Sequence, residues 1–208
     1  RFSLVVLHFL SEDEKTRSLK IYEKSFIAPN IVETDKSCNS YNGKFCFIGR
    51  LVEIKGVSDL LQTERVSIDF FGHDQEGFSE KIVKHNTHNY LGVLDHDDVS
   101  AALGNYEVFI LPSYAEGLPT SAIEAALSGR ILLISYNCNL DELRDGFDCI
   151  KFTPGVEGIE SAILRFKSMT YGQRKLMAEN CARTASIFFG KESVTNKYLE
   201  VINESIYK

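Results

Sequence analysis

Short apolar runs alternate with amphipathic, helix-like segments along the chain from residue 45 onward. The runs are rich in Val, Ile, Leu and Phe, as expected for strands that are buried on both faces of a parallel sheet. Six such runs precede helical patterns: FCFIG, VSIDFFG, YLGVL, YEVFILP, ILLIS and CIKF. The helical pattern after the fifth run is NLDELRDG, at residues 139–146. We predict an α/β fold, with a Rossmann-like three-layer α/β/α domain and a parallel sheet of about six strands.

The two ends of the chain depart from this alternation. Residues 171–208 have no strand signal and predict two helices that are separated near Gly190. SLVVLHFLS, a charged segment and SFIAPNIVE predict a strand, a helix and a strand before the main sheet. We therefore divide the chain into three segments. Residues 1–30 precede the α/β domain and are not part of it, residues 31–170 form the α/β domain, and residues 171–208 form helices that pack back on it.

Charge, cysteines and hydropathy narrow the classes of protein to consider. The net charge of -6 and the pI near 5.4 argue against a general nucleic-acid binder, which carries a basic excess. The five cysteines form no CxxC pair, and neither they nor the histidines have the spacing of metal ligands. We expect free thiols in a reducing compartment, no metal site and a cytoplasmic protein. No apolar run reaches the roughly 18–20 residues that span a bilayer.

Ligands of doubly wound sheets gather at the carboxyl ends of the strands, where four turns carry candidate residues. In the first turn, FIGRLVEIKG, Arg50 and Lys55 stand ahead of a helix. A guanidinium and an ammonium beside a helix start would suit a diphosphate. The alternative is that both are solvated surface cations, as Arg and Lys usually are.

The second and third turns have plainer explanations. In DFFGHDQEG, Gly72 and Gly77 bracket a polar loop, and Gly72 would either let a ligand approach the backbone or simply serve the turn. In NYLGVLDHDD, Asp97 or Asp98 fits a helix cap and the helix dipole. We assign these two acids to structure.

The fourth turn, AEGLPTSAIEAALSGR, places Glu116 and Glu124 eight positions apart around a Gly-Leu-Pro turn. Ser121 to Glu124 fits an S-x-x-E capping box, and Pro119 suits the first turn of a helix. Capping leaves Glu116 unexplained, because it lies upstream in the turn after a strand. The motif is therefore open between helix chemistry and a ligand site.

Five segments in order resemble the donor-binding half of a retaining glycosyltransferase, and more narrowly family 4 of the GT-B fold with its E-x7-E motif. These segments are GRLVEIKG, FFGHDQEG, YLGVLDHDDV, LPSYAEGLPTSAIEAALSG and DELRDGFDCIKF. Glu116 and Glu124 match the two glutamates of the motif. The resemblance covers residues 26–153 and implies that residues 1–30 are the remnant of, or the linker from, an N-terminal acceptor domain.

The resemblance implies a role for each matching residue. Arg50 and Lys55 match the basic pair that holds the nucleotide diphosphate and stabilises the leaving phosphate. These cations make a metal ion unnecessary in the family, so no cofactor is expected. Glu116 would be the third catalytic residue beside Arg50 and Lys55, and it would contact hydroxyls of the donor sugar. Glu124 matches the residue that binds the ribose of the nucleotide.

Further donor contacts follow from position in the same motifs. The N–H groups of Gly117, Leu118 and Thr120 match backbone contacts to sugar and phosphate, whereas Pro119 has no N–H and shapes the turn. Gly72 and Leu94 lie in loops that approach the base. The segment YNCNLDE, at residues 136–142, departs from the family pattern because it lacks a glycine pair, which puts a ligand contact at that loop in doubt.

The implied enzyme is a glycosyltransferase of the hexosyltransferase type. It would move a sugar from a nucleotide diphosphate to a hydroxyl of a saccharide or lipid-linked acceptor, as in polysaccharide biosynthesis. Its partners would be this donor and an acceptor held by the N-terminal domain, with the full-length enzyme either free in the cytoplasm or peripheral at the inner face of the membrane. The isolated fragment is expected to be weakly active or inactive. The alternatives are a GT-B-like sugar-nucleotide epimerase and a non-catalytic nucleotide-sugar-binding module.

Overall fold

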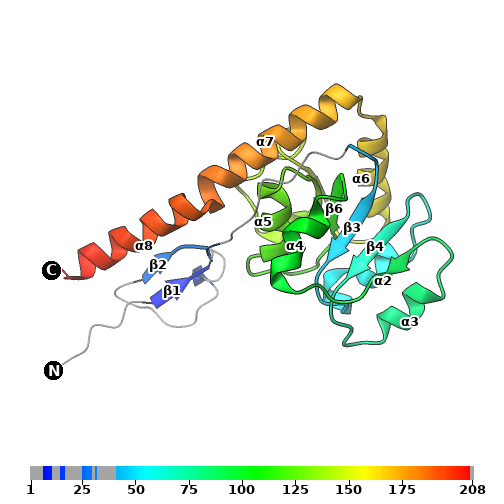
Figure 1. Cartoon of the computed structure of the whole chain (residues 1–208), viewed down its shortest axis with the longest axis horizontal. Coiled ribbons are helices and arrows are strands. Elements are labelled where there is room, and N and C mark those ends of the chain that lie inside the picture. The colour runs from blue at the N-terminus through cyan, green and yellow to red at the C-terminus, as the bar shows by residue number, and fades with distance from the viewer. Residues whose placement is uncertain (1–6, 11–14, 17–24, 30, 32–40, 207–208) are drawn as a thin grey trace.

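A six-stranded parallel sheet with helices on both faces forms the main body of the protein (Figure 1). The computed structural model describes residues 7–10, 15–16, 25–29, 31 and 41–206. The strands of the sheet are β3 (Phe45–Ile48), β4 (Ile68–Phe71), β5 (Asn89–Tyr90), β6 (Val108–Leu111), β7 (Ile131–Ser135) and β8 (Ile150–Phe152). Every neighbouring pair is parallel. The predicted Rossmann-like architecture is confirmed.

The order of the strands places a topological switch in the middle of the sheet. The order is β5-β4-β3-β6-β7-β8. From the central strand β3, the chain adds β4 and β5 on one side, then crosses back and adds β6, β7 and β8 on the other side. The register between β3 and β6 pairs Phe45 with Val108 and Cys46 with Phe109, near the amino ends of both strands. The chain therefore leaves the carboxyl ends of β3 and β6 toward helices on opposite faces of the sheet. Sheets of this type bind ligands at such a switch point.

Burial explains why the apolar runs became strands. All residues of β3, β6 and β7 are buried, as parallel strands between two helical layers must be. Phe47 and Phe70 are paired across β3 and β4 with ring centroids 5.5 Å apart. The described cysteines, Cys46, Cys138, Cys149 and Cys181, are free and buried in the core, and Cys38 lies outside the described residues.

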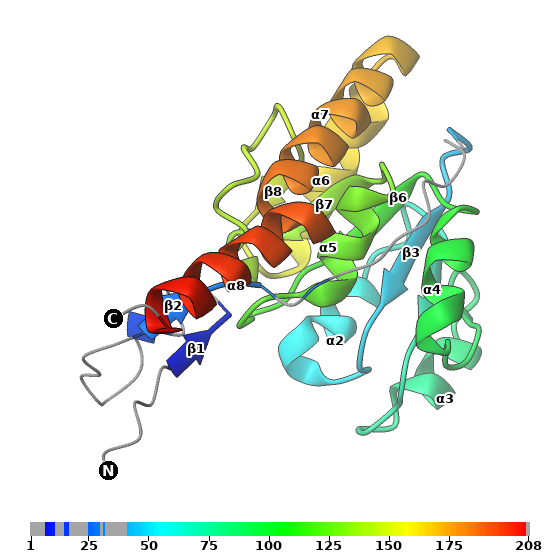
Figure 2. The same cartoon turned by 60° about the vertical axis from the view of Figure 1, so that its left-hand side comes forward.

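Two groups of helices cover the two faces of the sheet (Figure 2). On one face lie α2 (Val57–Leu60), α3 (Phe78–Val83) and α6 (Val156–Ser168), with α2 packed against α6. On the other lie α4 (His96–Leu103), α5 (Thr120–Leu127) and α7 (Tyr171–Phe189), with α5 packed against both α4 and α7. Two short 3-10 helices, η1 (Glu53–Lys55) and η2 (Tyr136–Cys138), follow β3 and β7.

The helix expected at residues 139–146 does not form, and this prediction was wrong. The segment is a series of turns that starts at Asn139 in the left-handed conformation, with φ 52°. The carboxylate of Asp148 accepts a hydrogen bond from the backbone N–H of Arg144 at 2.9 Å and another from its guanidinium at 2.8 Å. Such side-chain bonds offer the backbone an alternative to helical pairing.

The two helices predicted at the C-terminus are confirmed. The first, α7, begins with a capping box between Thr170 and Gln173, and it ends before Gly190, where α8 (Lys191–Ile206) starts. The second runs on toward a small parallel pair, β1 (Leu7–Phe9) and β2 (Ser25–Ile27), as Figure 1 shows. Most of the helix predicted between these strands lies outside the described residues, and the division into three segments stays a prediction.

Candidate nucleotide-sugar site

The turns that follow β3 and β6 meet through an ion pair. Lys55, the last residue of η1, places Nζ 2.5 Å from Oε1 and 2.7 Å from Oε2 of Glu116. The exposed fractions of the two side chains are only 15% and 8%. The structure thus brings together two of the predicted site residues, 61 positions apart, at the switch point of the sheet.

A glycine makes this approach possible. Gly56 has φ 73°, and a Cβ placed on it would lie 2.6 Å from the carbonyl oxygen of Pro112, at the end of β6. The backbone N–H of Tyr114 also donates to the carbonyl of Ile54 at 2.8 Å. The two turns are therefore in direct backbone contact, and this contact fixes where Lys55 points.

A buried hydroxyl completes the surroundings of Glu116. Ser113 is fully buried and donates from Oγ to Oε1 of Glu116 at 2.5 Å. The carbonyl of Ser113 accepts in turn from Oγ of Ser135, at the end of β7, at 2.5 Å. Ser113 was not predictable as a site residue from the sequence, because serine is common in turns and gives no signal of its own.

The second glutamate of the motif has a different environment. Glu124 lies on α5 with a side chain that is 7% exposed, and Nδ1 of His96 at the start of α4 is 3.7 Å from Oε1. Among the described residues, none donates a hydrogen bond to its carboxylate. Burial raises the pKa of Glu124, and His96 partly opposes that shift. A carboxylate in this state can accept hydrogen bonds from a ligand.

The predicted capping box does not form. The N-cap of α5 is Pro119, which makes no side-chain cap bond, so Ser121 is the second residue of the helix rather than its cap. Glu124 then falls one turn further along, too deep in the helix to reach back to its start, and faces His96 instead. Capping is therefore not the reason for either glutamate.

The N-terminus of α5 is open between the two carboxylates. Among the described residues, the N–H groups of Gly117, Leu118 and Thr120 have no hydrogen-bond partner in the protein. A Cβ on Gly117 would meet nothing within 4 Å, so neither packing nor a left-handed φ requires glycine there. Backbone donors at a helix start suit an anion or the oxygens of a sugar.

The remaining predicted residues lie around the same edge of the sheet. Arg50 is exposed directly after β3, and its guanidinium has no partner among the described residues. Gly72 is fixed by packing, because a Cβ there would lie 1.8 Å from the carbonyl oxygen of Gly49. Leu94 is half-buried in the turn after β5 and packs against the core.

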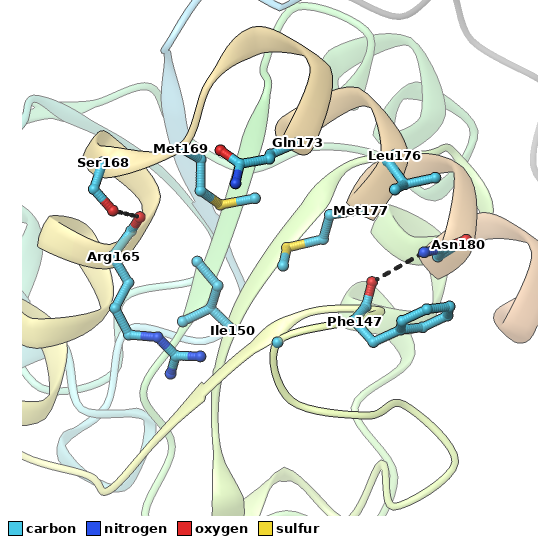
Figure 3. A pocket seen from close by; sticks show the side chains of 10 residues that line it. Phe147, Ile150, Arg165, Ser168, Met169, Gln173, Leu176, Met177 and Asn180 are labelled. Atoms are coloured by element: carbon cyan, nitrogen blue, oxygen red, sulfur yellow. Dashed lines mark hydrogen bonds between the residues drawn. The ribbon is translucent and has the colours of Figure 1, made fainter.

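A separate cavity of about 340 Å³ lies between α6, α7 and the turn before β8 (Figure 3). Ile150, Met169 and Met177 line its centre, with the guanidinium of Arg165 at its edge. That guanidinium already donates to Asp145 at 2.9 Å and to the carbonyl of Lys151 at 3.1 Å. The cavity lies by the amino end of β8 and contains none of the predicted site residues, so we assign the site to the carboxyl edge of the sheet.

Two further properties bear on the chemistry of the chain. Within the described ranges, no group of three or more His, Cys, Asp or Glu residues could hold a metal ion. None of the described helices is long and apolar enough to cross a membrane.

Residues 42–168 match the family model of the glycosyl transferases group 1. This chain belongs to that family. The match spans all the turns described above, from β3 through α5 to the end of α6. The membership of the group 1 glycosyltransferases and the fold expected from the sequence are confirmed, and the chain is a glycosyltransferase domain.

Two curated relatives carry the same similarity. A Klebsiella pneumoniae protein, described as an uncharacterized 41.2 kDa protein in the cps region, is 26% identical over 187 residues, covering 82% of this chain and 50% of its own. The N,N'-diacetylbacillosaminyl-diphospho-undecaprenol alpha-1,3-N-acetylgalactosaminyltransferase of Campylobacter jejuni is 27% identical over 124 residues, covering 57% and 31%. The chain therefore spans half or less of the length of these relatives.

Solved glycosyltransferase structures share the fold. Sucrose-phosphate synthase from Thermosynechococcus elongatus has a TM-score of 0.81 at 14% identity, covering 97% of this chain and 58% of its own. HepE from Anabaena, solved in complex with UDP, has a TM-score of 0.80 at 15% identity, covering 96% and 64%. At such identities the likeness establishes the architecture of this group 1 glycosyltransferase domain.

Proposed function

We propose that this chain is the nucleotide-sugar-binding domain of a retaining glycosyltransferase of the hexosyltransferase type. The observation that carries the proposal is the Lys55–Glu116 pair at the open N-terminus of α5, in the crevice of the topological switch. Solved relatives of the same fold hold UDP or UDP-glucose, which supports a nucleotide diphosphate sugar as the donor.

The cations would bind the diphosphate. Arg50 and Lys55 both lie in the turn after the carboxyl end of β3. Among the described residues, none binds the guanidinium of Arg50 and would compete with a phosphate for it. When the bond between the sugar carbon and the phosphate oxygen breaks, negative charge grows on that oxygen, and nearby cations stabilise it. The protein would then need no metal ion for this step.

The carboxylates and the helix start would hold the rest of the donor. Lys55 neutralises Glu116, and Ser113 fixes one carboxylate oxygen, which leaves Glu116 oriented to accept from a sugar hydroxyl. Glu124 would accept from the ribose, since no described donor occupies its carboxylate. Gly117, Leu118 and Thr120 would donate their N–H groups to sugar and phosphate oxygens, while Gly72 and Leu94 would border the base.

The acceptor side of the reaction requires more of the protein than this chain. The chain covers half or less of its curated relatives, and one of these is named for a transfer to a diphospho-undecaprenol-linked sugar. We propose a saccharide or lipid-linked acceptor, bound by an N-terminal domain, and a full-length enzyme in the cytoplasm or at the inner face of the membrane. Alone, the chain would bind the donor weakly and transfer little.

Calorimetric titration of the 208-residue chain with UDP, GDP and ADP tests the proposal. We expect one of them to bind at millimolar concentration or below, and Arg50→Ala and Lys55→Ala each to weaken that binding about tenfold, as lost charge-assisted bonds do. Lys84→Ala is the control, because this lysine is 79% exposed and pairs only with Glu80. The proposal fails if none of the three nucleotides binds, or if both site variants bind as the wild type does.

A further inference from the structure

The turn after β7 holds the turn after β6 through two side-chain amides. Nδ2 of Asn139 donates to the carbonyl oxygen of Glu116 at 2.5 Å and lies 3.4 Å from that of Gly117. Nδ2 of Asn137 donates to the carbonyl of Tyr114 at 2.8 Å. The backbone of the glutamate turn is thus fixed from the neighbouring turn by atoms outside the family motif.

Asn139 combines two properties that few residues share. It has φ 52° and ψ 40°, and it is the only non-glycine residue with positive φ among those the structure describes. Asparagine tolerates this left-handed conformation better than most residues. Glycine would tolerate it too, but glycine has no amide to donate.

The orientation of the Glu116 and Gly117 carbonyls determines where the N–H groups of the next residues point. In a planar trans peptide the C=O and the following N–H point in opposite directions. An amide that holds the carbonyl of Glu116 on the side of β7 therefore turns the N–H of Gly117 away from β7. The weaker contact to the carbonyl of Gly117 does the same for the N–H of Leu118. These are the donors for which the part of the chain that the structure describes offers no hydrogen-bond partner.

We propose that Asn139 is a positioning residue that aims the N–H groups of Gly117 and Leu118 at the phosphate and sugar oxygens of a nucleotide diphosphate sugar. This inference rests on the proposed function for the identity of the ligand. It assigns a task to the turn after β7, which lacks the glycine pair expected there. Without the amide, the two peptide planes are free to rotate, and the donors no longer face one direction.

The test uses Asn139→Gly in the 208-residue chain, because glycine keeps the backbone conformation and removes the side-chain amide. We expect UDP to bind at least about tenfold more weakly, while the melting temperature stays within a few degrees of that of the wild type. Asn139→Asp should bind UDP more weakly still, since its carboxylate faces two carbonyl oxygens. Asn42→Gly is the matched control, because its amide donates to the carbonyl of Asn105 at 2.8 Å, near the amino ends of the strands.

Backbone ¹H–¹⁵N spectra without ligand provide the second measurement. The resonances of Gly117 and Leu118 should move in Asn139→Gly and stay in Asn42→Gly. If the wild type binds UDP and Asn139→Gly binds it equally well, the inference is overturned and the proposed function stands. If the wild type binds none of UDP, GDP and ADP, the proposed function fails, and unchanged Gly117 and Leu118 resonances in Asn139→Gly would overturn the positioning role as well.

Discussion

Glu116 and Glu124 are the same residue type in one motif, yet their surroundings give them different chemistry. Glu116 is neutralised by Lys55 and fixed by Ser113, so its charge is balanced by the protein. Glu124 is at least as buried, and among the described residues its one charged neighbour is His96, whose Nδ1 lies 3.7 Å from its carboxylate. A buried carboxylate without hydrogen bonds lowers the stability of the folded protein. We infer that the carboxylate of Glu124 serves to accept hydrogen bonds from a bound ligand.

Glu124→Gln separates the two interpretations of the motif. Burial raises the pKa of Glu124 in the folded protein, so the wild type loses stability as pH rises from below the unfolded pKa through the folded one. The glutamine side chain of the variant has no charge to bury, so we expect the variant to melt at the same temperature as the wild type at about pH 3 and higher at about pH 7. Nucleotide affinity should fall about tenfold. Thermal melts at both pH values and calorimetry with UDP check this.

A capping role for Glu124 predicts the opposite result. Removing a cap costs about 0.5–2 kcal/mol of stability and leaves ligand affinity unchanged. Ser121→Ala serves as the control variant, because Ser121 occupies the other end of the S-x-x-E sequence and caps nothing in the structure. A drop in melting temperature at neutral pH with full UDP affinity in Glu124→Gln would contradict the ligand role.

At the scale of elements, glycines decide which turns can meet. Gly56 and Gly77 have nearly equal backbone angles, φ 73° and 74°, and each precedes a short helix. A Cβ on Gly56 would lie 2.6 Å from the carbonyl oxygen of Pro112, whereas one on Gly77 would meet nothing within 4 Å. Of these two glycines, only Gly56 therefore lies at the contact between the turn after β3 and the end of β6.

Gly56→Ala and Gly77→Ala form a matched pair. Both should lose about 1–2 kcal/mol because alanine is strained at positive φ. Gly56→Ala should lose about 1–3 kcal/mol more, because the overlap with Pro112 forces the backbone to move. Urea unfolding measures both values, and UDP affinity should fall only in Gly56→Ala, where Lys55 moves away from Glu116. Equal losses of stability in the two variants would contradict this account.

The elements themselves were predictable where burial dominates. FCFIG and ILLIS read as strands because every position of β3 and β7 is buried, and no turn chemistry competes. NLDELRDG has the composition of an amphipathic helix, but the bonds that Arg144 donates to Asp148 and the left-handed Asn139 outweigh that preference. The local sequence pattern does not reveal Asp148 as a partner, because its carboxylate reaches the N–H and guanidinium of Arg144 only when the turn is folded.

The site was predictable only in part, for a related physical reason. The turn after the first strand indicated Lys55, and the E-x7-E motif indicated Glu116 and Glu124. The contact between Lys55 and Glu116 depends on β3 lying beside β6. Ser113 and Asn139 act through a hydroxyl and an amide in turns, where such residues are frequent for other reasons. The role of each side chain depends on which carbonyl or carboxylate oxygen accepts its hydrogen bond. That partner comes from another part of the chain and is set only by the folded structure.

At the scale of the whole molecule, the last helix connects segments that are far apart in the sequence. In Figure 1, α8 lies beside β1 and β2 rather than over the main sheet. The hydroxyl of Tyr198 lies 3.0 Å from Nε2 of His8 and 3.5 Å from the carbonyl of Pro29. A parallel pair of strands has little stability by itself, so α8 is part of what holds it.

Tyr198→Phe tests this connection. The variant loses the hydroxyl and its hydrogen bonds, so we expect α8 to open more easily by about 0.5–1.5 kcal/mol. Hydrogen exchange of amides in α8 measures the change directly. Tyr171→Phe is the control, since Tyr171 is 58% exposed at the start of α7 and packs edge-on against Tyr41. Equal exchange in α8 of Tyr198→Phe and the wild type would contradict a holding role.

The neighbouring position of β3 and β6 also governs how the molecule assembles. Lys55 and Glu116 are 61 positions apart, and β4, α3, β5 and α4 lie between them in the chain. Contacts of such long range form slowly, because the intervening loop must close before they stabilise anything. Binding of a nucleotide during refolding would therefore report the moment when the two halves of the sheet join, later than the appearance of helical secondary structure.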